Sequence, residues 1–302
     1  MIELTDTNAA GIAAEFVASR LRAGSPAMSM VLTLVVVVDE DGSDDAMQVA
    51  RKASHEHPAR VLGVILGDAR GGSQINAQVG TGAGWTGETA LIRLQGEVVK
   101  HAESVVLPLL LPDSPVAIWW PSDQPDDPAA DPLGALAQRR ITDAAAAVRG
   151  KSKAIHLQCS SYAPGNTDLA WTRITPWRAL LAAALDQQPL KVTGGAVTAE
   201  RISPSAELLV AWLAGRLKVG IDRKNSQGPG ITEVRLDTKE GPIVISRRDG
   251  RLATFSSPDR PDRPVALTRR ELPELLAEEL RRLDEDDVYA ATARTLTKLS
   301  RS

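Results

Sequence analysis

The pattern of hydrophobic and polar positions changes halfway along the chain. In the first half, residues 31–38 (VLTLVVVV) form a continuous apolar run interrupted by a single threonine. A β-branched run of this kind is typical of a strand that is buried on both faces of a parallel sheet. Runs of similar character predict further strands over residues 60–66, 88–96, 116–120 and 154–160.

Segments with helical spacing separate these strands. The apolar positions predict helices over residues 8–21, 44–55, 97–111, 133–138 and 141–149. We expect Asp44 to cap the second of these helices and Pro108 to kink the third. A Gly- and Gln-rich stretch, residues 67–87, is expected to be a loop that leads into an edge strand. The alternation of strands and helices predicts an α/β layered domain with a mostly parallel sheet.

The second half has a different pattern. After a polar break at residues 160–168, apolar and polar residues alternate over 231–238, 242–250 and 251–257, which predicts an antiparallel meander. One more strand is expected near residues 190–197. Helices are predicted over residues 176–186, 204–217, 268–282 and 285–299, the first two with Thr175 and Ser203 as caps. We therefore predict an α/β domain over residues 1–165 and a mixed α+β domain over residues 166–302.

Length and composition are those of a globular protein with one large or two medium domains. The chain has 302 residues, of which 43% are hydrophobic and 24% charged. The formal net charge is −3 and no long basic run is present, so we expect neither nucleic acid nor an anionic membrane as the main partner. The apolar runs are too short to span a bilayer, the N-terminus lacks the order of a secretory signal, and Cys159 is the single cysteine. These features predict a cytoplasmic protein.

Motifs for common enzyme chemistry are missing from the sequence. There is no P-loop, and the fragment GTGAG (residues 80–84) is followed by Trp-Thr-Gly where a dinucleotide-binding helix should begin. His55 and His57 lie two residues apart, which does not place both on one helical face, and they lack a third metal ligand. Ser160 and Ser161 lack the GxSxG elbow of a nucleophile. We therefore expect no catalytic residue, metal or cofactor.

What remains is a set of large aromatic and cationic side chains. Two adjacent tryptophans end a predicted strand, so we expect one in the core and the other at the sheet margin. Ligands and partners bind at the carboxyl ends of parallel strands, and Trp and Arg are enriched at the energetic centres of protein interfaces. We therefore predict a partner-binding surface formed by Trp119, Trp120, Arg139, Arg140, Asp143, Trp171, Arg173, Trp177 and Arg178.

The same residues also admit a structural interpretation. Trp171 and Trp177 can plug the junction between the two halves, with the arginines paired to the acidic loop at residues 126–131. Arg178 favours the binding interpretation, because it lies in the first turn of a predicted helix, where the helix dipole disfavours a positive charge. An arginine there more often serves an acidic partner than the helix itself. Both interpretations stay open on the sequence alone.

Three long motifs are specific enough to indicate a family. They are SVVLPLLLPDSPVAIWWP, DPLGALAQRRITDA and WTRITPWRALLAAALDQ, and HPARV precedes them. Together they resemble OpcA, the glucose-6-phosphate dehydrogenase assembly protein family of actinobacteria and cyanobacteria. The similarity extends over most of the chain and is densest over residues 104–186. It implies a non-enzymatic activator that binds the dehydrogenase and promotes its active oligomer, with the Trp and Arg residues named above at the contact or holding its surface in shape.

Two further expectations follow from the resemblance and from the residues. In photosynthetic members of the family, cysteines are linked to thioredoxin control, and Cys159 alone leaves only an intermolecular disulfide for such control here. The main rival to an assembly factor is an α/β sensor or enzyme that binds a sugar phosphate or a nucleotide, because glycine-rich strand ends and several arginines suit a phosphate. A third interpretation is a scaffold that joins the dehydrogenase to other enzymes of its pathway.

Overall fold

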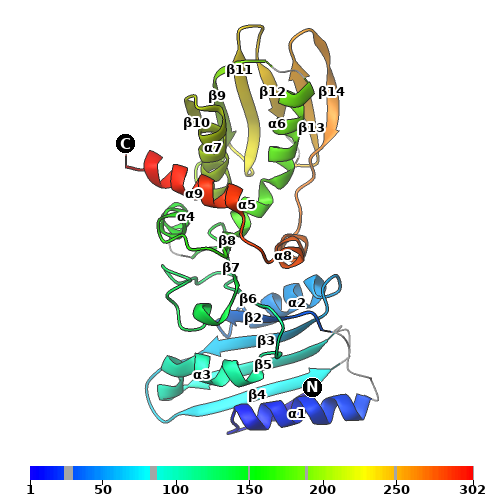
Figure 1. Cartoon of the computed structure of the whole chain (residues 1–302), viewed down its shortest axis with the longest axis vertical. Helices are drawn as coiled ribbons and strands as arrows, with labels where there is room; N and C mark the ends of the chain where they lie inside the picture. Colours follow the sequence, from blue (N-terminus) through cyan, green and yellow to red (C-terminus); the bar gives the residue numbers. More distant parts are fainter. Residues whose placement is uncertain (24–29, 82–86, 149, 188–189, 248–249, 302) are drawn as a thin grey trace. The chain divides into compact units, whose positions relative to one another are not determined.

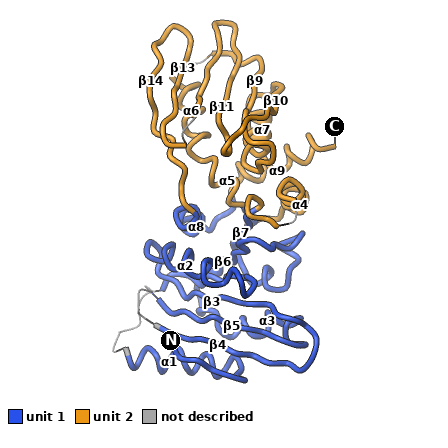
Figure 2. Tube along the Cα trace, turned by 180° about the vertical axis from the view of Figure 1, so that it is seen from behind, with its two compact units in different colours: residues 1–143, 165–167, 272–285 blue, residues 144–164, 168–271, 286–302 orange. Residues whose placement is uncertain are grey.

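The chain forms two compact units, each built from several separate stretches of sequence (Figure 1, Figure 2). The computed structural model describes residues 1–23, 30–81, 87–148, 150–187, 190–247 and 250–301. Unit 1 comprises Met1–Asp143, Gly165–Thr167 and Leu272–Glu285, and unit 2 comprises Ala144–Pro164, Asp168–Glu271 and Asp286–Ser302. The chain therefore passes from one unit to the other repeatedly. The division into two contiguous domains at residues 165 and 166 stays a prediction of the sequence.

Unit 1 is built on a sheet whose central strands are parallel. Within the described residues its eight strands are β1 (Ile2–Leu4), β2 (Leu32–Val38), β3 (Ala59–Leu66), β4 (Gln74–Thr81), β5 (Glu88–Gln95), β6 (Val116–Trp119), β7 (Arg139–Thr142) and β8 (Asn166–Asp168). They lie in the order β1-β4-β5-β3-β2-β6-β7-β8. The neighbours from β5 to β7 pair in parallel, whereas β4 is antiparallel to β5 and β1 is antiparallel to β4.

Helices cover both faces of this sheet. Leu62 and Val64 of β3 share a buried cluster with α1 (Ala9–Ala23) and α3 (Ala102–Val106). Gly63, between them, faces the opposite side, because successive strand residues alternate. There Met47 of α2 (Ser43–Ala53) approaches to 2.7 Å from the position that a Cβ would take. With both faces covered, β2 is buried at every position. The predicted α/β layered fold is confirmed.

A helix from near the end of the sequence completes unit 1. This helix, α8 (Leu272–Arg281), packs beside α2 and buries Leu275, Leu276 and Leu280. Figure 2 draws α8 in the colour of unit 1, although the residues before and after it in the sequence belong to unit 2. The α8 segment therefore contributes to the core of unit 1, although it follows the other segments of this unit by more than a hundred residues in the sequence. The sequence pattern does not indicate this contribution.

Unit 2 combines a mostly antiparallel sheet with helices. Within the described residues the six strands are β9 (Val192–Ala199), β10 (Ile221–Asn225), β11 (Ile231–Thr238), β12 (Ile243–Ser246), β13 (Leu252–Ser257) and β14 (Arg260–Ala266). Their order is β10-β9-β11-β12-β13-β14, and only β10 and β9 pair in parallel among these residues. The predicted meander is confirmed, and the mixed α+β character of this half with it.

Five helices surround the core of unit 2 in the described part of the chain. They are α4 (Lys151–Ser160), α5 (Leu169–Arg173), α6 (Thr175–Gln187), α7 (Pro204–Leu217) and α9 (Asp287–Leu299). One buried cluster contains residues from all of them and from the sheet. The predicted Ser203 cap of α7 is confirmed, because its side chain accepts a hydrogen bond from the amide of Ala206.

Two sequence-based predictions of local structure are wrong. Residues 154–160 form part of helix α4 rather than a strand, and the buried residues Ala154, Ile155 and Cys159 follow a helical spacing. Residues 133–148 contain the short 3-10 turn Gly134–Leu136 and strand β7 instead of two helices. The β7 strand is stabilised by its parallel pairing with β6, a long-range contact that a short apolar segment does not reveal.

Smaller differences concern helix ends and edge strands. The segment predicted as one kinked helix over 97–111 is broken into the 3-10 helices Gly96–His101 and Leu107–Leu109 around α3. The N-cap of α2 is Gly42, and Asp44 lies in the first turn. Strands β10 and β14, both at sheet edges, were not predicted. The GTGAG fragment and the predicted strand segment over residues 242–250 lie partly outside the described residues.

Candidate functional site

The adjacent tryptophans at the end of β6 are both buried in unit 1. Trp119 is 0% exposed and Trp120 is 2% exposed, so the expectation that one would lie at the sheet margin is wrong. Trp119 is paired with Val36 and Ile141 on the neighbouring strands. Trp120 packs on Gly134, where a Cβ would lie 3.2 Å from its ring. Both faces of the sheet are covered here, and each face receives one indole.

Arg139 is a buried cation of unit 1 with a buried partner. It is 4% exposed, and its Nη2 donates to a carboxylate oxygen of Glu279 on α8. Its Nη1 donates to the carbonyl of Asp284 at 3.1 Å. Arg139 therefore fixes the distant helix α8 to strand β7, rather than pairing with the acidic loop that follows the tryptophans.

Arg140 and Asp143 are the other two unit 1 residues of the predicted surface. Arg140 is half-buried, and it donates from Nε to the side-chain oxygen of Asn166 and from Nη1 to the carbonyl of Ala137, both at 2.6 Å. Asp143 is 1% exposed, and its amide donates to Gln124 at 3.1 Å. The contact of Arg140 with Asn166 holds the short strand β8 beside β7, and the contact of Asp143 with Gln124 holds the loop that follows β6.

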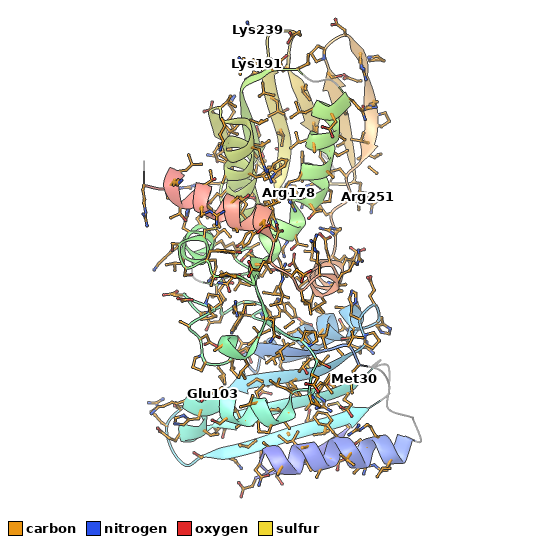
Figure 3. The ribbon with its side chains drawn as sticks, viewed as in Figure 1. Met30, Glu103, Arg178, Lys191, Lys239 and Arg251 are labelled. Atoms are coloured by element: carbon orange, nitrogen blue, oxygen red, sulfur yellow. The ribbon has the colours of Figure 1, made fainter. Side chains whose placement is uncertain are left out.

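Trp171 is the centre of an aromatic and charged cluster in unit 2. The guanidinium of Arg178, labelled in Figure 3, lies 3.6 Å from the centroid of the indole, a cation–π contact. The indole Nε1 donates to Asp286 at 2.8 Å, and the same carboxylate caps α9 by accepting from the amides of Val288 and Tyr289. Trp171 is 1% exposed. This contact gives the arginine in the first turn of α6 an aromatic partner within unit 2.

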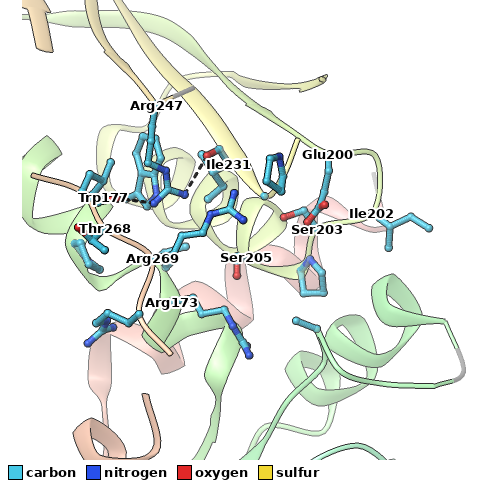
Figure 4. Close-up of a pocket in the computed structure, with 18 of the residues that line it drawn as sticks. Arg173, Trp177, Glu200, Ile202, Ser203, Ser205, Ile231, Arg247, Thr268 and Arg269 are labelled. Carbon is cyan, nitrogen blue, oxygen red and sulfur yellow. Dashed lines mark hydrogen bonds between the residues drawn. The ribbon is translucent and has the colours of Figure 1, made fainter. Parts of the chain in front are cut away.

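A cavity of about 310 Å³ lies within unit 2 (Figure 4). Its walls come from the end of α5, the beginnings of α6 and α7, strand β11 and the segment over residues 267–270. Trp177 and Arg247 form one wall, with the guanidinium carbon 5.1 Å from the ring centroid. Arg247 donates to the carbonyls of Leu267 at 2.8 Å and Ile231 at 3.2 Å, which fixes its orientation.

The lining of this cavity is strongly cationic. Arg270 is also oriented by a carbonyl, that of Thr172. The α7 N-terminus, capped by Ser203, adds the positive end of a helix dipole. Among the described lining residues one carboxylate, Glu200, stands against five cations, which are Lys151, Arg173, Arg247, Arg269 and Arg270. A cavity of this charge favours an anion.

A second polar cluster in unit 2 has the order of groups of a serine hydrolase triad. His156 Nε2 lies 2.9 Å from Glu207 Oε2, and its Nδ1 lies 2.8 Å from Ser300 Oγ. The Ser300 hydroxyl donates to the carbonyl of Leu296 at 2.9 Å. The hydrogen bond with Glu207 raises the pKa of His156. A serine hydroxyl that is engaged with a backbone carbonyl is not arranged as a nucleophile, and we interpret the cluster as a clamp between helices α4, α7 and α9.

Cys159 is a buried thiol of α4. Burial is the largest cause that raises its pKa well above the ordinary value of 9.0, and the negative charge of Asp168 acts in the same direction. Because the thiolate is the nucleophile in disulfide exchange, a neutral thiol at 4% exposure is inert in the folded chain. An intermolecular disulfide through Cys159 therefore requires that unit 2 open locally.

The structure brings together some of the sequence-predicted residues and separates others. Arg173 and Trp177 line the cavity, and Trp171 and Arg178 form their own cluster in the same unit. The other five predicted residues belong to unit 1. Sequence reasoning missed Lys151, Glu200, Arg247, Arg269 and Arg270. The only signals were the arginine pairs at 247–248 and 269–270, and Arg248 lies outside the described residues.

Two classes of site are not found in the part of the chain that the structure describes. Within these ranges, His, Cys, Asp and Glu side chains form no group of three or more that could hold a metal ion. None of the helices in the same ranges combines the length and the apolar character needed to cross a membrane.

Comparison with known families gives two matches that lie side by side on the chain. A model described as the glucose-6-phosphate dehydrogenase subunit N-terminal domain matches residues 50–159. A model described as the C-terminal domain of the same subunit matches residues 164–293. Together they cover most of the chain in the order that their descriptions give. No curated protein matches the sequence.

Solved structures with some similarity are remote. An oxidoreductase from Sinorhizobium meliloti shares 10% identity with a TM-score of 0.46, and the alignment covers 89% of this chain and 95% of that chain. A structure described as trehalose-6-phosphate from E. coli bound with UDP-2-fluoro glucose shares 12% identity with a TM-score of 0.27, over 65% of each chain. Similarities at this level do not indicate a function.

Proposed function

Because this chain belongs to the OpcA family of glucose-6-phosphate dehydrogenase subunits, we propose that it binds glucose-6-phosphate dehydrogenase and favours the active oligomer of that enzyme. The observation that carries the proposal is the pair of family matches, which lie in the expected order over residues 50–159 and 164–293. The chain then acts in the pentose phosphate pathway, and we propose a cytoplasmic location for it.

The proposed action is allosteric and saturable. A binding protein changes the activity of an enzyme only if it binds one state of that enzyme better than another. We infer that this chain prefers the assembled, substrate-competent dehydrogenase. Its addition should therefore lower the apparent KM for substrate or raise kcat, up to a plateau at full occupancy.

We further propose that the chain performs no reaction of its own. Both serine hydroxyls at the cavity are engaged in structure, since Ser203 caps α7 and Ser205 donates to the carbonyl of Ala170 at 3.0 Å. In the triad-like cluster with His156 and Glu207, the Ser300 hydroxyl is engaged with the carbonyl of Leu296. The proposal predicts that the purified chain turns over neither glucose 6-phosphate nor NADP.

The nine sequence-predicted residues divide by exposure into two proposed roles. Six are buried and are proposed to hold the binding surface in shape: Trp119, Trp120, Arg139, Asp143, Trp171 and Trp177. Arg140, Arg173 and Arg178 are half-buried, and we propose that these three reach the dehydrogenase. An arginine anchor at an interface contributes about 2 kcal/mol when truncated to alanine, roughly thirtyfold in affinity.

The test uses two of these arginines and a distant control. Arg140→Ala and Arg178→Ala are compared with Lys239→Ala, an exposed cation labelled in Figure 3 at the end of unit 2 remote from Arg178. Each variant is titrated against the dehydrogenase, with circular dichroism to establish folding. We expect the two arginine variants to need more protein for half-maximal activation and the lysine variant to match the wild type. If both arginine variants fold and activate normally, the assignment of these residues is wrong.

A further inference from the structure

The cationic cavity of unit 2 has a shape and size suited to a small molecule. Its volume of about 310 Å³ lies at the low end of the range for ligand pockets, roughly 300–1,000 Å³. This space suits a metabolite of one-ring size better than a dinucleotide. Ile174, Trp177 and Leu267 supply apolar wall for the body of such a molecule. A few oriented polar groups against an apolar wall are the usual composition of a specific site.

Two arginines of the cavity are oriented by hydrogen bonds to backbone carbonyls. Arg247 is 7% exposed, stacks on Trp177 and donates to two backbone carbonyls. Arg270 donates to the carbonyl of Thr172. A guanidinium held in this way loses little conformational entropy when it binds an anion, and its fork of donors matches phosphate oxygens.

Arg269 and Lys151 contribute the exposed cations of the site. Figure 4 shows Arg269 reaching from the segment over residues 267–270 toward the side of the cavity formed by Glu200 and Ser203. Its Nη2 lies 3.2 Å from the position that a Cβ would take on Gly230, so a glycine there leaves room for the guanidinium. In the described ranges no carboxylate lies within ion-pair distance of Arg269 or of Lys151.

We propose that this cavity binds a phosphate monoester, with the phosphate held by Arg247, Arg269 and Arg270 near the N-terminus of α7. A phosphate dianion satisfies several guanidiniums at once, and the positive end of a helix favours the same group. The neutral part of the ligand packs against Trp177 and Ile174. Binding needs no dehydrogenase, so the inference stands apart from the proposed function.

The test is calorimetry on the full purified chain in a buffer of low salt that contains no phosphate. The probes are glucose 6-phosphate, inorganic phosphate, glucose and NADP. We expect one saturable site for glucose 6-phosphate, weaker binding of inorganic phosphate, and no binding of glucose. Because the cavity is small, NADP should bind more weakly than glucose 6-phosphate. Binding of glucose as tight as that of its phosphate, tighter binding of NADP, or no binding of either phosphate probe overturns the proposal.

Variants locate the binding to the cavity. Arg269→Ala should raise the Kd for glucose 6-phosphate at least about tenfold, equivalent to about 1.4 kcal/mol. Lys151→Ala, from a different wall, should weaken binding in the same direction. The matched control is Arg260→Ala, an exposed arginine of β14 that does not line the cavity, and its Kd should stay within about twofold of wild type. Equal losses in the Arg269 and Arg260 variants would indicate nonspecific attraction and contradict the site.

Discussion

Buried arginines in the two units have different partners. In unit 1, Arg60 is 9% exposed and donates to Glu88 at 2.7 Å, and Arg139 is paired with Glu279. In unit 2, Arg247 is equally buried but is fixed by two carbonyls and an indole at the wall of a cavity. These contacts keep the guanidinium of Arg247 in one orientation at the cavity wall.

The arginine pairs of unit 1 connect distant segments of the fold, whereas the arginines of unit 2 line the cavity that is proposed to bind a phosphate. The pairs of unit 1 lie between segments far apart in sequence, 28 residues for Arg60 and Glu88 and 140 for Arg139 and Glu279. They specify how the sheet and α8 come together. In unit 2 five cations share one space with a single carboxylate among the described lining residues.

The largest predicted effect concerns the buried pair at α8. Glu279→Gln leaves Arg139 with a positive charge that is buried and no longer balanced, and the free energy of unfolding should fall by about 3–5 kcal/mol. Denaturant unfolding measures the change. The matched control is Glu56→Gln, which removes the exposed partner of Arg281, the last residue of the same helix α8. The side chains of Glu56 and Arg281 are 54% and 65% exposed. This control should cost less than about 1 kcal/mol. Similar losses in both variants would contradict the assigned role of burial.

A smaller loss is expected at the cation–π contact of unit 2. Arg178→Ala removes the guanidinium that lies on Trp171 and donates to Thr175, and we expect a loss of about 1 kcal/mol in unfolding free energy. Arg178→Lys keeps the charge but not the planar stack, so its loss should be intermediate. Indole fluorescence should shift in both variants, because Trp171 loses a neighbour. An unchanged stability in Arg178→Ala means that the stack contributes nothing.

The cavity arginine should behave in the opposite way to those of unit 1. Arg269→Ala removes one of several like charges and an exposed side chain, so the free energy of unfolding should stay within about 0.5 kcal/mol of wild type. Added phosphate should raise the thermal midpoint of the wild type but much less that of the variant, because a ligand stabilises the state it binds. A large loss of unfolding free energy in this variant would show that Arg269 stabilises the fold, as the arginines of unit 1 do, and would contradict this prediction.

The smallest expected effect is the pH response of the His156 clamp. The hydrogen bond with Glu207 raises the pKa of His156 above its ordinary value of 6.5 in the folded chain. Its contribution to stability is therefore fully present below 6.5 and is lost as pH rises through the folded-state pKa. Because the side chain is 38% exposed, the effect is a fraction of that for a buried pair. The difference in unfolding free energy between wild type and His156→Gln should shrink from acid to alkaline pH; a constant difference would argue against the clamp.

The sequence predicts the layers of the fold because hydrophobic patterning is a local signal. The β2 run and the helical spacing of α7 each identify an element without reference to the rest of the chain. The failures are short segments whose structure depends on distant contacts. Strand β7 contains Arg139, which is tolerated in the sheet only because Glu279 lies beside it. The edge strand β10 (IDRKN) is polar and gives no apolar signal.

The candidate site was only partly predictable for the same reason. The tryptophans and arginines after β6 are conspicuous in the sequence, and the structure uses most of them inside the units. The cations of the cavity come from residues 151, 173, 247, 269 and 270, and only the fold of unit 2 brings them together. Of the residues that line the cavity, sequence reasoning identified Arg173 and Trp177 as site residues.

The most direct test of the account is to mix the purified chain with its cognate dehydrogenase, measure the mass of the mixture by light scattering, and assay activity on the same samples. The account predicts a complex heavier than either protein, with more of the dehydrogenase in its larger oligomer and a saturable gain in kcat/KM. A mixture whose mass is that of the separate proteins, with unchanged kinetics across the titration, would contradict it.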